Sequence, residues 1–120
     1  MVRVFDLVDQ KFAAVSEFAV GNVQSAALGS GDGESHCTLL RLKPGAFLGP
    51  HEAGFGQLFV VVFGDGWVAG ADGKRLPIKA SQAAFIARGE VHSKGASEAM
   101  MALVIQVRNL TLAATPVEGR

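Results

Sequence analysis

The chain has 120 residues, of which 49% are hydrophobic, and its 11 basic and 11 acidic side chains leave no net charge. This length is enough for one domain with a core of its own, without disulfides or a structural metal. The lack of net charge disfavours nucleic acid and anionic membranes as partners, and it favours self-association.

The single cysteine, Cys37, excludes a disulfide within the chain and is typical of a reducing compartment. Asp6 and Asp9 come too early for the apolar segment of a signal peptide. No apolar run approaches the roughly 20 residues that a membrane helix requires. We therefore expect a cytoplasmic protein that does not enter a membrane.

Short apolar segments alternate with turn signals along the whole chain. Turns such as Pro44-Gly45 and Asp72-Gly73 separate runs rich in Val, Leu, Phe and Ile. Segments of strand length at this spacing predict an all-β sandwich or barrel with little helix. The expected strands cover about 2–8, 23–28, 35–43, 46–51, 57–63, 66–71, 75–79, 82–87, 91–94 and 99–107. Residues 10–18 are long enough for one helical turn, and residues 113–120 are expected to form a loose tail.

The alternation of side chains in two of these strands indicates what they face. In the segment 35–43, His36 and Thr38 share the more apolar face and should point inward, whereas Cys37 lies on the other face. In the segment 57–63 both faces are apolar, so both must be covered. A small barrel covers only one face of a strand. The outer face therefore needs a second sheet layer or a partner chain, and we predict a homodimer.

Two sets of residues at fixed offsets mark the centre of the chain. The first set, over residues 45–64, is Gly45, His51, Ala53, Gln57 and Gly64, and the second, over residues 81–96, is Ser81, Ala87, Gly89, His92 and Ala96. These offsets resemble the two motifs of the cupins, G-x5-H-x-H-x3–4-E-x6-G and G-x5-P-x-G-x2-H-x3-N. The resemblance implies that residues 1–120 form a single cupin domain, folded as a double-stranded β-helix, or jelly-roll barrel.

The resemblance also implies a place for a divalent metal, which cupins bind through two His and one Glu of the first motif and one His of the second. His51 and His92 match this set, whereas Ala53 and Gln57 replace the second His and the Glu. A neutral carboxamide oxygen is a much weaker metal donor than a carboxylate. With His36 as a third imidazole from the neighbouring strand, the set His36, His51, Gln57 and His92 would suit Zn, Fe, Ni or Cu and leave one position open.

Each of these residues also has a purely structural interpretation. His36 alone can be a buried, hydrogen-bonded core histidine. His51 and His92 can be a vestigial pair that hydrogen-bonds to each other and to Gln57. Gln57 can simply line the mouth of a cavity, or it can orient a ligand through its donor and its acceptor.

The expected pocket lining is mostly apolar and favours a small, partly hydrophobic ligand. It consists of Thr38, Phe47, Ala53 and Phe59. Two functions fit these residues, because a fold analogy gives the place of a site and not its reaction. One is a metal-dependent enzyme of the dioxygenase, isomerase or lyase type. The other is a non-catalytic barrel that binds a small molecule, or a vestigial barrel without metal.

Overall fold

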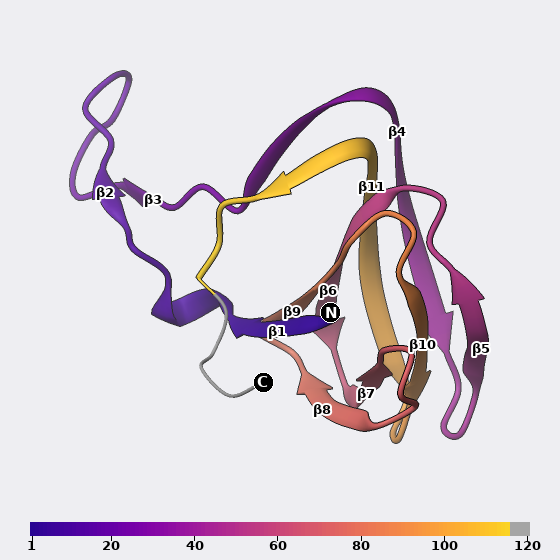
Figure 1. Cartoon of the computed structure of the whole chain (residues 1–120). Coiled ribbons are helices and arrows are strands. Elements are labelled where there is room, and N and C mark those ends of the chain that lie inside the picture. The colour runs from indigo at the N-terminus through magenta and orange to yellow at the C-terminus, as the bar shows by residue number, and fades with distance from the viewer. Residues whose placement is uncertain (116–120) are drawn as a thin grey trace.

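The structure, a computed structural model, describes residues 1–115 and consists almost entirely of β-strands (Figure 1). The strands are β1 (Arg3–Asp6), β2 (Ala13–Ala14), β3 (Gln24–Ser25), β4 (Gly29–Leu42), β5 (Phe47–Glu52), β6 (Gly56–Phe63), β7 (Asp65–Ala69), β8 (Arg75–Lys79), β9 (Gln82–Ile86), β10 (Val91–Ala96) and β11 (Met100–Leu112). A 3-10 turn, Leu7–Asp9, follows β1. The predicted all-β fold is confirmed. Within the described residues, no helix is long and apolar enough to cross a membrane.

Two antiparallel sheets enclose the main core. One has the strand order β1-β9-β6-β11-β4 and the other the order β5-β10-β7-β8. Alternate side chains of each strand point between the sheets, and the largest fully buried apolar ones in this core are Val4, Phe59, Val68, Ile78, Ile86 and Met100, each no more than 1% exposed. This arrangement leaves two seams, one where β4 and β5 are the edge strands and one where β1 and β8 are.

Two strands are longer than the sequence predicts. β4 begins at Gly29 and β11 ends at Leu112, and these two residues pair with each other. The glycines at 29–33 signal a turn in isolation, but here they accompany a second strand. A Cβ on Gly31 would collide with the carbonyl oxygen of Asn109, so the close approach of the two backbones requires glycine. The pair arches away from the barrel (Figure 1).

The chain itself covers part of the outer face of the five-stranded sheet. Leu58 of β6 is 4% exposed and belongs to a second cluster with Phe5 and Ala114, against which Leu7 and Leu28 pack. The second layer that the apolar strand β6 requires is therefore supplied in part by the segments near the two ends of the described chain.

The two terminal segments differ from expectation. No helix forms at residues 10–18; β2 pairs with β3 instead, and the hairpin projects from the barrel (Figure 1). The first residues of the expected loose tail are tied down. The N–H groups of residues 113 and 114 donate to the Leu28 carbonyl at 3.0 and 3.1 Å, and Gln10 exchanges two hydrogen bonds with Thr115. Residues 116–120 lie outside the described residues.

Candidate functional site

Two histidines lie side by side on neighbouring strands, with their rings tilted by 54°. His51 of β5 pairs with His92 of β10, and their ring centroids are 4.3 Å apart. His51 is exposed, and its Nδ1 donates to the Gly49 carbonyl oxygen at 2.8 Å. His92 is 0% exposed, and neither of its ring nitrogens has a hydrogen-bond partner within the described chain. Burial, followed by the charges of Lys94 and His51, lowers the pKa of His92 to about 4, so this imidazole is neutral at pH 7.

A buried lysine lies beside this pair. Lys94 follows His92 by two residues on β10 and points to the same side, toward the facing sheet. Its Nζ donates to Oε1 of Gln57 on β6 at 2.7 Å and lies 4.8 Å from the ring centroid of Phe59. Lys94 and Gln57 are each 3% exposed. Burial lowers the pKa of Lys94 to about 8, which leaves the amine mostly protonated at pH 7. No carboxylate forms an ion pair with it among residues 1–115.

A row of polar side chains leads from the surface to this lysine. The strand register aligns His36 of β4 with Gln106 of β11, and Gln106 with Gln57 of β6. His36 is exposed, Gln106 is half-buried and Gln57 is buried. Partners directly opposite in an antiparallel sheet share one face, so the row crosses the inner face from the edge strand inward.

His36 is engaged at the rim and does not approach the other two histidines. Its Nε2 donates to the Glu34 carboxylate at 2.7 Å, and its ring stacks on Phe55 with centroids 5.9 Å apart. The hydrogen bond from His36 is the main cause of the lowered pKa of the exposed Glu34. The predicted inward parity of His36 agrees with its row, but β4 is the edge strand, so its side chain remains 54% exposed.

Phe47 differs from the predicted pocket lining because β5 contains a bulge. His92 pairs with His51 but Lys94 pairs with Leu48, so three residues of β5 span two of β10. Because of this additional residue, the side chains of β5 that precede the bulge lie on the opposite face of the sheet from the one that simple alternation predicts. Phe47 is consequently 61% exposed and packs against Trp67 at 6.3 Å between ring centroids.

The other expected lining residues occupy different depths. Phe59 is 0% exposed in the core, and Thr38 is exposed on β4 at the rim. Ala53 is 3% exposed, and its backbone is held by hydrogen bonds to Glu90 and Gly89 at 2.9 and 2.8 Å. These bonds fix the start of the β5–β6 connection against the start of β10.

The donor set at this place does not fit a cupin metal centre. His51 and His92 are the only imidazoles brought together within residues 1–115, and the Gln57 oxygen accepts from the Lys94 ammonium. The described residues contain no group of three or more His, Cys, Asp or Glu side chains able to hold a metal. A protonated amine at this point also repels a second cation.

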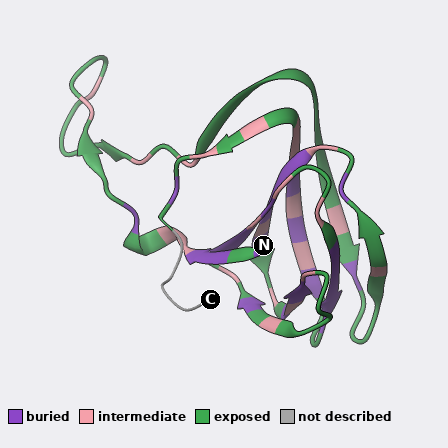
Figure 2. Cartoon of the chain, viewed as in Figure 1, coloured by how far each residue is buried: buried purple, intermediate pink, exposed green. Residues whose placement is uncertain are grey.

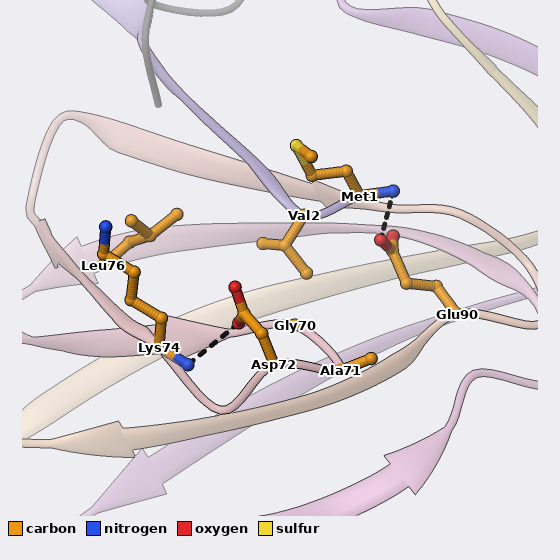
Figure 3. A pocket seen from close by; sticks show the side chains of 8 residues that line it. All are labelled: Met1, Val2, Gly70, Ala71, Asp72, Lys74, Leu76 and Glu90. Carbon is orange, nitrogen blue, oxygen red and sulfur yellow. Dashed lines mark hydrogen bonds and ion pairs between the residues drawn. The ribbon is translucent and has the colours of Figure 1, made fainter.

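A separate cavity of about 380 Å³ lies beside the β1–β8 seam (Figure 3). It is lined by Met1, Val2, Gly70, Ala71, Asp72, Lys74, Leu76 and Glu90, and the Glu90 carboxylate pairs with the amino group of Met1. This lining shares no residue with the group of His51, Gln57, His92 and Lys94.

Solved structures of low sequence identity share this architecture. A cupin superfamily protein from Desulfitobacterium hafniense is 12% identical, with 67% of this chain and 75% of that chain covered and a TM-score of 0.57. A predicted oxalate decarboxylase from Thermotoga maritima is 20% identical, with 82% and 91% covered and a TM-score of 0.57. A Klebsiella pneumoniae protein with a double-stranded β-helix domain is 21% identical, with 72% and 80% covered and a TM-score of 0.58.

No protein-family model and no curated protein matches the sequence. The structural likeness shows that the chain has the cupin fold, a double-stranded β-helix, as the two motifs predicted.

Two residues of the site escaped the sequence analysis. Lys94 had a signal in the sequence, because alternation from an inward His92 points it inward as well. Gln106 had none, because its place beside Gln57 depends on the register between β6 and β11.

Proposed function

We propose that this protein binds a small organic ligand between its two sheets, beside His92. The observation that carries this proposal is the pair of unpartnered ring nitrogens on a side chain that is 0% exposed. Buried polar atoms are nearly always hydrogen-bonded, so a buried ring with none calls for a partner that the chain does not supply. A neutral imidazole has one donor and one acceptor, and a ligand with a polar group satisfies either of them.

Two features of the chain support access to His92. The ring beside it belongs to exposed His51, whose only side-chain hydrogen bond within the described residues is the local one to Gly49, so outward rotation of this ring breaks one exposed hydrogen bond. The polar row from His36 through Gln106 to Gln57 provides hydrogen-bonding groups along the inner face of the sheet. We infer that the ligand is small, because Phe59 and Val68 fill the neighbouring interior.

Ligand binding has more support than metal-dependent catalysis. A dioxygenase, isomerase or lyase of the usual cupin type needs a metal centre, and the donor set around His51 and His92 does not fit one. The neutral His92 ring and the Lys94 amine are groups that recognise organic ligands without a metal.

The ring resonances of His92 in ¹H–¹⁵N NMR spectra test the proposal. Acetate, acetamide, lactate and glycerol are added singly to about 50 mM, because probes of this size bind at best with millimolar constants. At least one probe should shift the His92 signals, assigned by their absence in His92→Leu, in a saturable way both with and without EDTA. If none of the four moves these signals, the barrel does not bind ligands at His92 and the proposal fails.

We also propose a homodimer formed through the uncovered part of the outer sheet face. Leu39, Val62 and Phe63 remain 60%, 53% and 50% exposed there. Leu39 lies on β4, an edge strand that is exposed along almost its whole length (Figure 2), whereas Val62 and Phe63 lie at the end of β6, from which β11 separates β4. A second copy related by a two-fold axis would cover the apolar side chains of both copies at once and shield both strand edges.

Sedimentation velocity at micromolar concentration checks this assembly. The wild-type protein should sediment as a dimer and Leu39→Lys as a monomer. Val20→Lys, in the projecting loop where Val20 is 94% exposed, should remain a dimer. A monomeric wild-type protein would rule out this assembly.

We place the protein in the cytoplasm. Support comes from Cys37, whose exposed free thiol is compatible with a reducing compartment.

A further inference from the structure

We propose that the Lys94 ammonium supplies the positive charge that a metal supplies in other cupin sites, and that it anchors the carboxylate group of the ligand. This inference rests on the proposed ligand binding beside His92 and names the chemical class of the ligand. Its support comes from the place of the ammonium, its missing counter-ion and its unused donors.

The ammonium lies beside the position where the sequence motif has its metal-binding carboxylate. Gln57 occupies that position of the first motif, and its Oε1 accepts a hydrogen bond from Nζ of Lys94 at 2.7 Å. A carboxamide at position 57, in place of the carboxylate of the motif, suits this contact. A Glu at position 57 would neutralise the lysine, whereas the amide holds the ammonium in place and leaves its charge available.

The charge of Lys94 is not compensated by the described chain. The ion pairs among residues 1–115 involve Glu34 and Glu90, and none includes Lys94. A protonated amine that is 3% exposed is costly to bury without a counter-ion. A bound anion removes this cost, and a small carboxylate is the simplest organic anion that can supply it.

The geometry leaves donors for both oxygens of a carboxylate. The ammonium has three N–H donors, of which the hydrogen bond to Gln57 uses one. The neighbouring His92 ring, on the same side of β10, has a free N–H donor because neither nitrogen is paired. One carboxylate oxygen can thus accept from Lys94 while the other accepts from His92, provided that the ring of His51 moves aside.

A matched pair of ligands separates this inference from general binding. Acetate and acetamide have nearly the same shape, but only acetate carries a charge. In NMR titrations of the full chain we expect acetate to bind at least about tenfold more tightly than acetamide, because hydrogen bonds to charged groups are stronger than neutral ones. Equal affinity for the two ligands would overturn the role of Lys94 while leaving ligand binding intact. Binding of neither acetate nor acetamide would overturn the inference, and the proposed function would fail with it only if lactate and glycerol also left the His92 signals unchanged.

Two variants then assign the effect to Lys94. Lys94→Met should weaken acetate binding at least about tenfold and leave acetamide binding within about twofold, and the exposed control Lys43→Met should change neither. Gln57→Glu keeps the lysine but gives it an internal carboxylate, so it too should lose acetate binding. Retention of tight acetate binding in Lys94→Met or in Gln57→Glu would overturn the inference.

Discussion

Lys94→Met should be more stable than the wild-type protein at pH 7, by about 1–2 kcal/mol, which corresponds to a rise in Tm of roughly 5 °C. The pKa of Lys94 falls from 10.5 to about 8 on folding. A shift of that size costs about 3 kcal/mol of folding free energy while the amine is protonated in both states. The variant removes this cost, but it leaves the Gln57 oxygen without its donor, which returns about 1–2 kcal/mol.

The pH dependence of this stability difference tests the burial of Lys94 more directly. Between pH 8 and 10.5 the unfolded chain keeps the Lys94 proton and the folded chain loses it, so wild-type stability should rise with pH across this window. From pH 7 to pH 10.5 the difference in unfolding free energy should change by about 3 kcal/mol, so that Lys94→Met becomes less stable than wild type by about 1–2 kcal/mol. Urea unfolding at these pH values measures it, and groups common to both proteins cancel. A constant difference would mean that Lys94 is not buried as described.

His92 should make the protein sensitive to acid. Its pKa falls from 6.5 to about 4 on folding, chiefly through burial. As the pH drops from 6.5 to 4, the unfolded chain takes up a proton that the folded chain refuses, so stability should fall by about 3 kcal/mol across this window. His92→Leu, which has no titrating group, should lack this component.

The comparison that isolates His92 is the difference between wild type and His92→Leu at each pH from 7 to 4. Carboxylates that titrate below pH 5 act on both proteins and leave this difference unchanged. In Lys94→Met the pKa of His92 should still fall on folding, but by less, because the charge of Lys94 is the second cause of the low pKa. The loss of stability between pH 6.5 and pH 4 should therefore be smaller than in wild type. Parallel stability curves for wild type and His92→Leu would contradict the buried, unpaired ring.

The sequence was sufficient to predict the all-β fold, and the resemblance to the cupin motifs implied that His51 and His92 belong to one site. Turn signals delimit strands such as 75–79 and 82–86, which the structure places within a residue of the expectation. The motif offsets bring His51 and His92 together, and the two pair across β5 and β10. These features depend on local turn chemistry and on spacing along the chain, both of which can be read from one sequence.

Features that depend on pairing between strands could not be predicted. The bulge in β5 changes the side of Phe47, and alternation counted along the strand cannot reveal it. The glycines at 29–33 signal a turn locally, yet pairing with the end of β11 makes them a strand. His36 has the inward parity expected from its strand, but only the sheet order shows that this strand is an edge.

Lys94, the buried cation of the barrel, could not be recognised from the motifs for a different reason. The motif comparison directs attention to His51, Ala53, Gln57 and His92, the positions that a metal would use. Lys94 falls outside those positions, although the same alternation that turns His92 inward also turns Lys94 inward. The carboxamide of Gln57 and the ammonium of Lys94 are complementary groups, and their contact becomes visible only across the two sheets.

We infer that this barrel carries a buried cation, Lys94, beside the position where the cupin motif has its metal-binding carboxylate. The most direct measurement is an NMR titration of the ε-methylene resonance of Lys94, assigned by its absence in Lys94→Met, in EDTA-treated protein free of added anions. The structure predicts a midpoint at about pH 8. A midpoint near 10.5, the value of an exposed lysine, would contradict the claim and show that the amine lies in solvent.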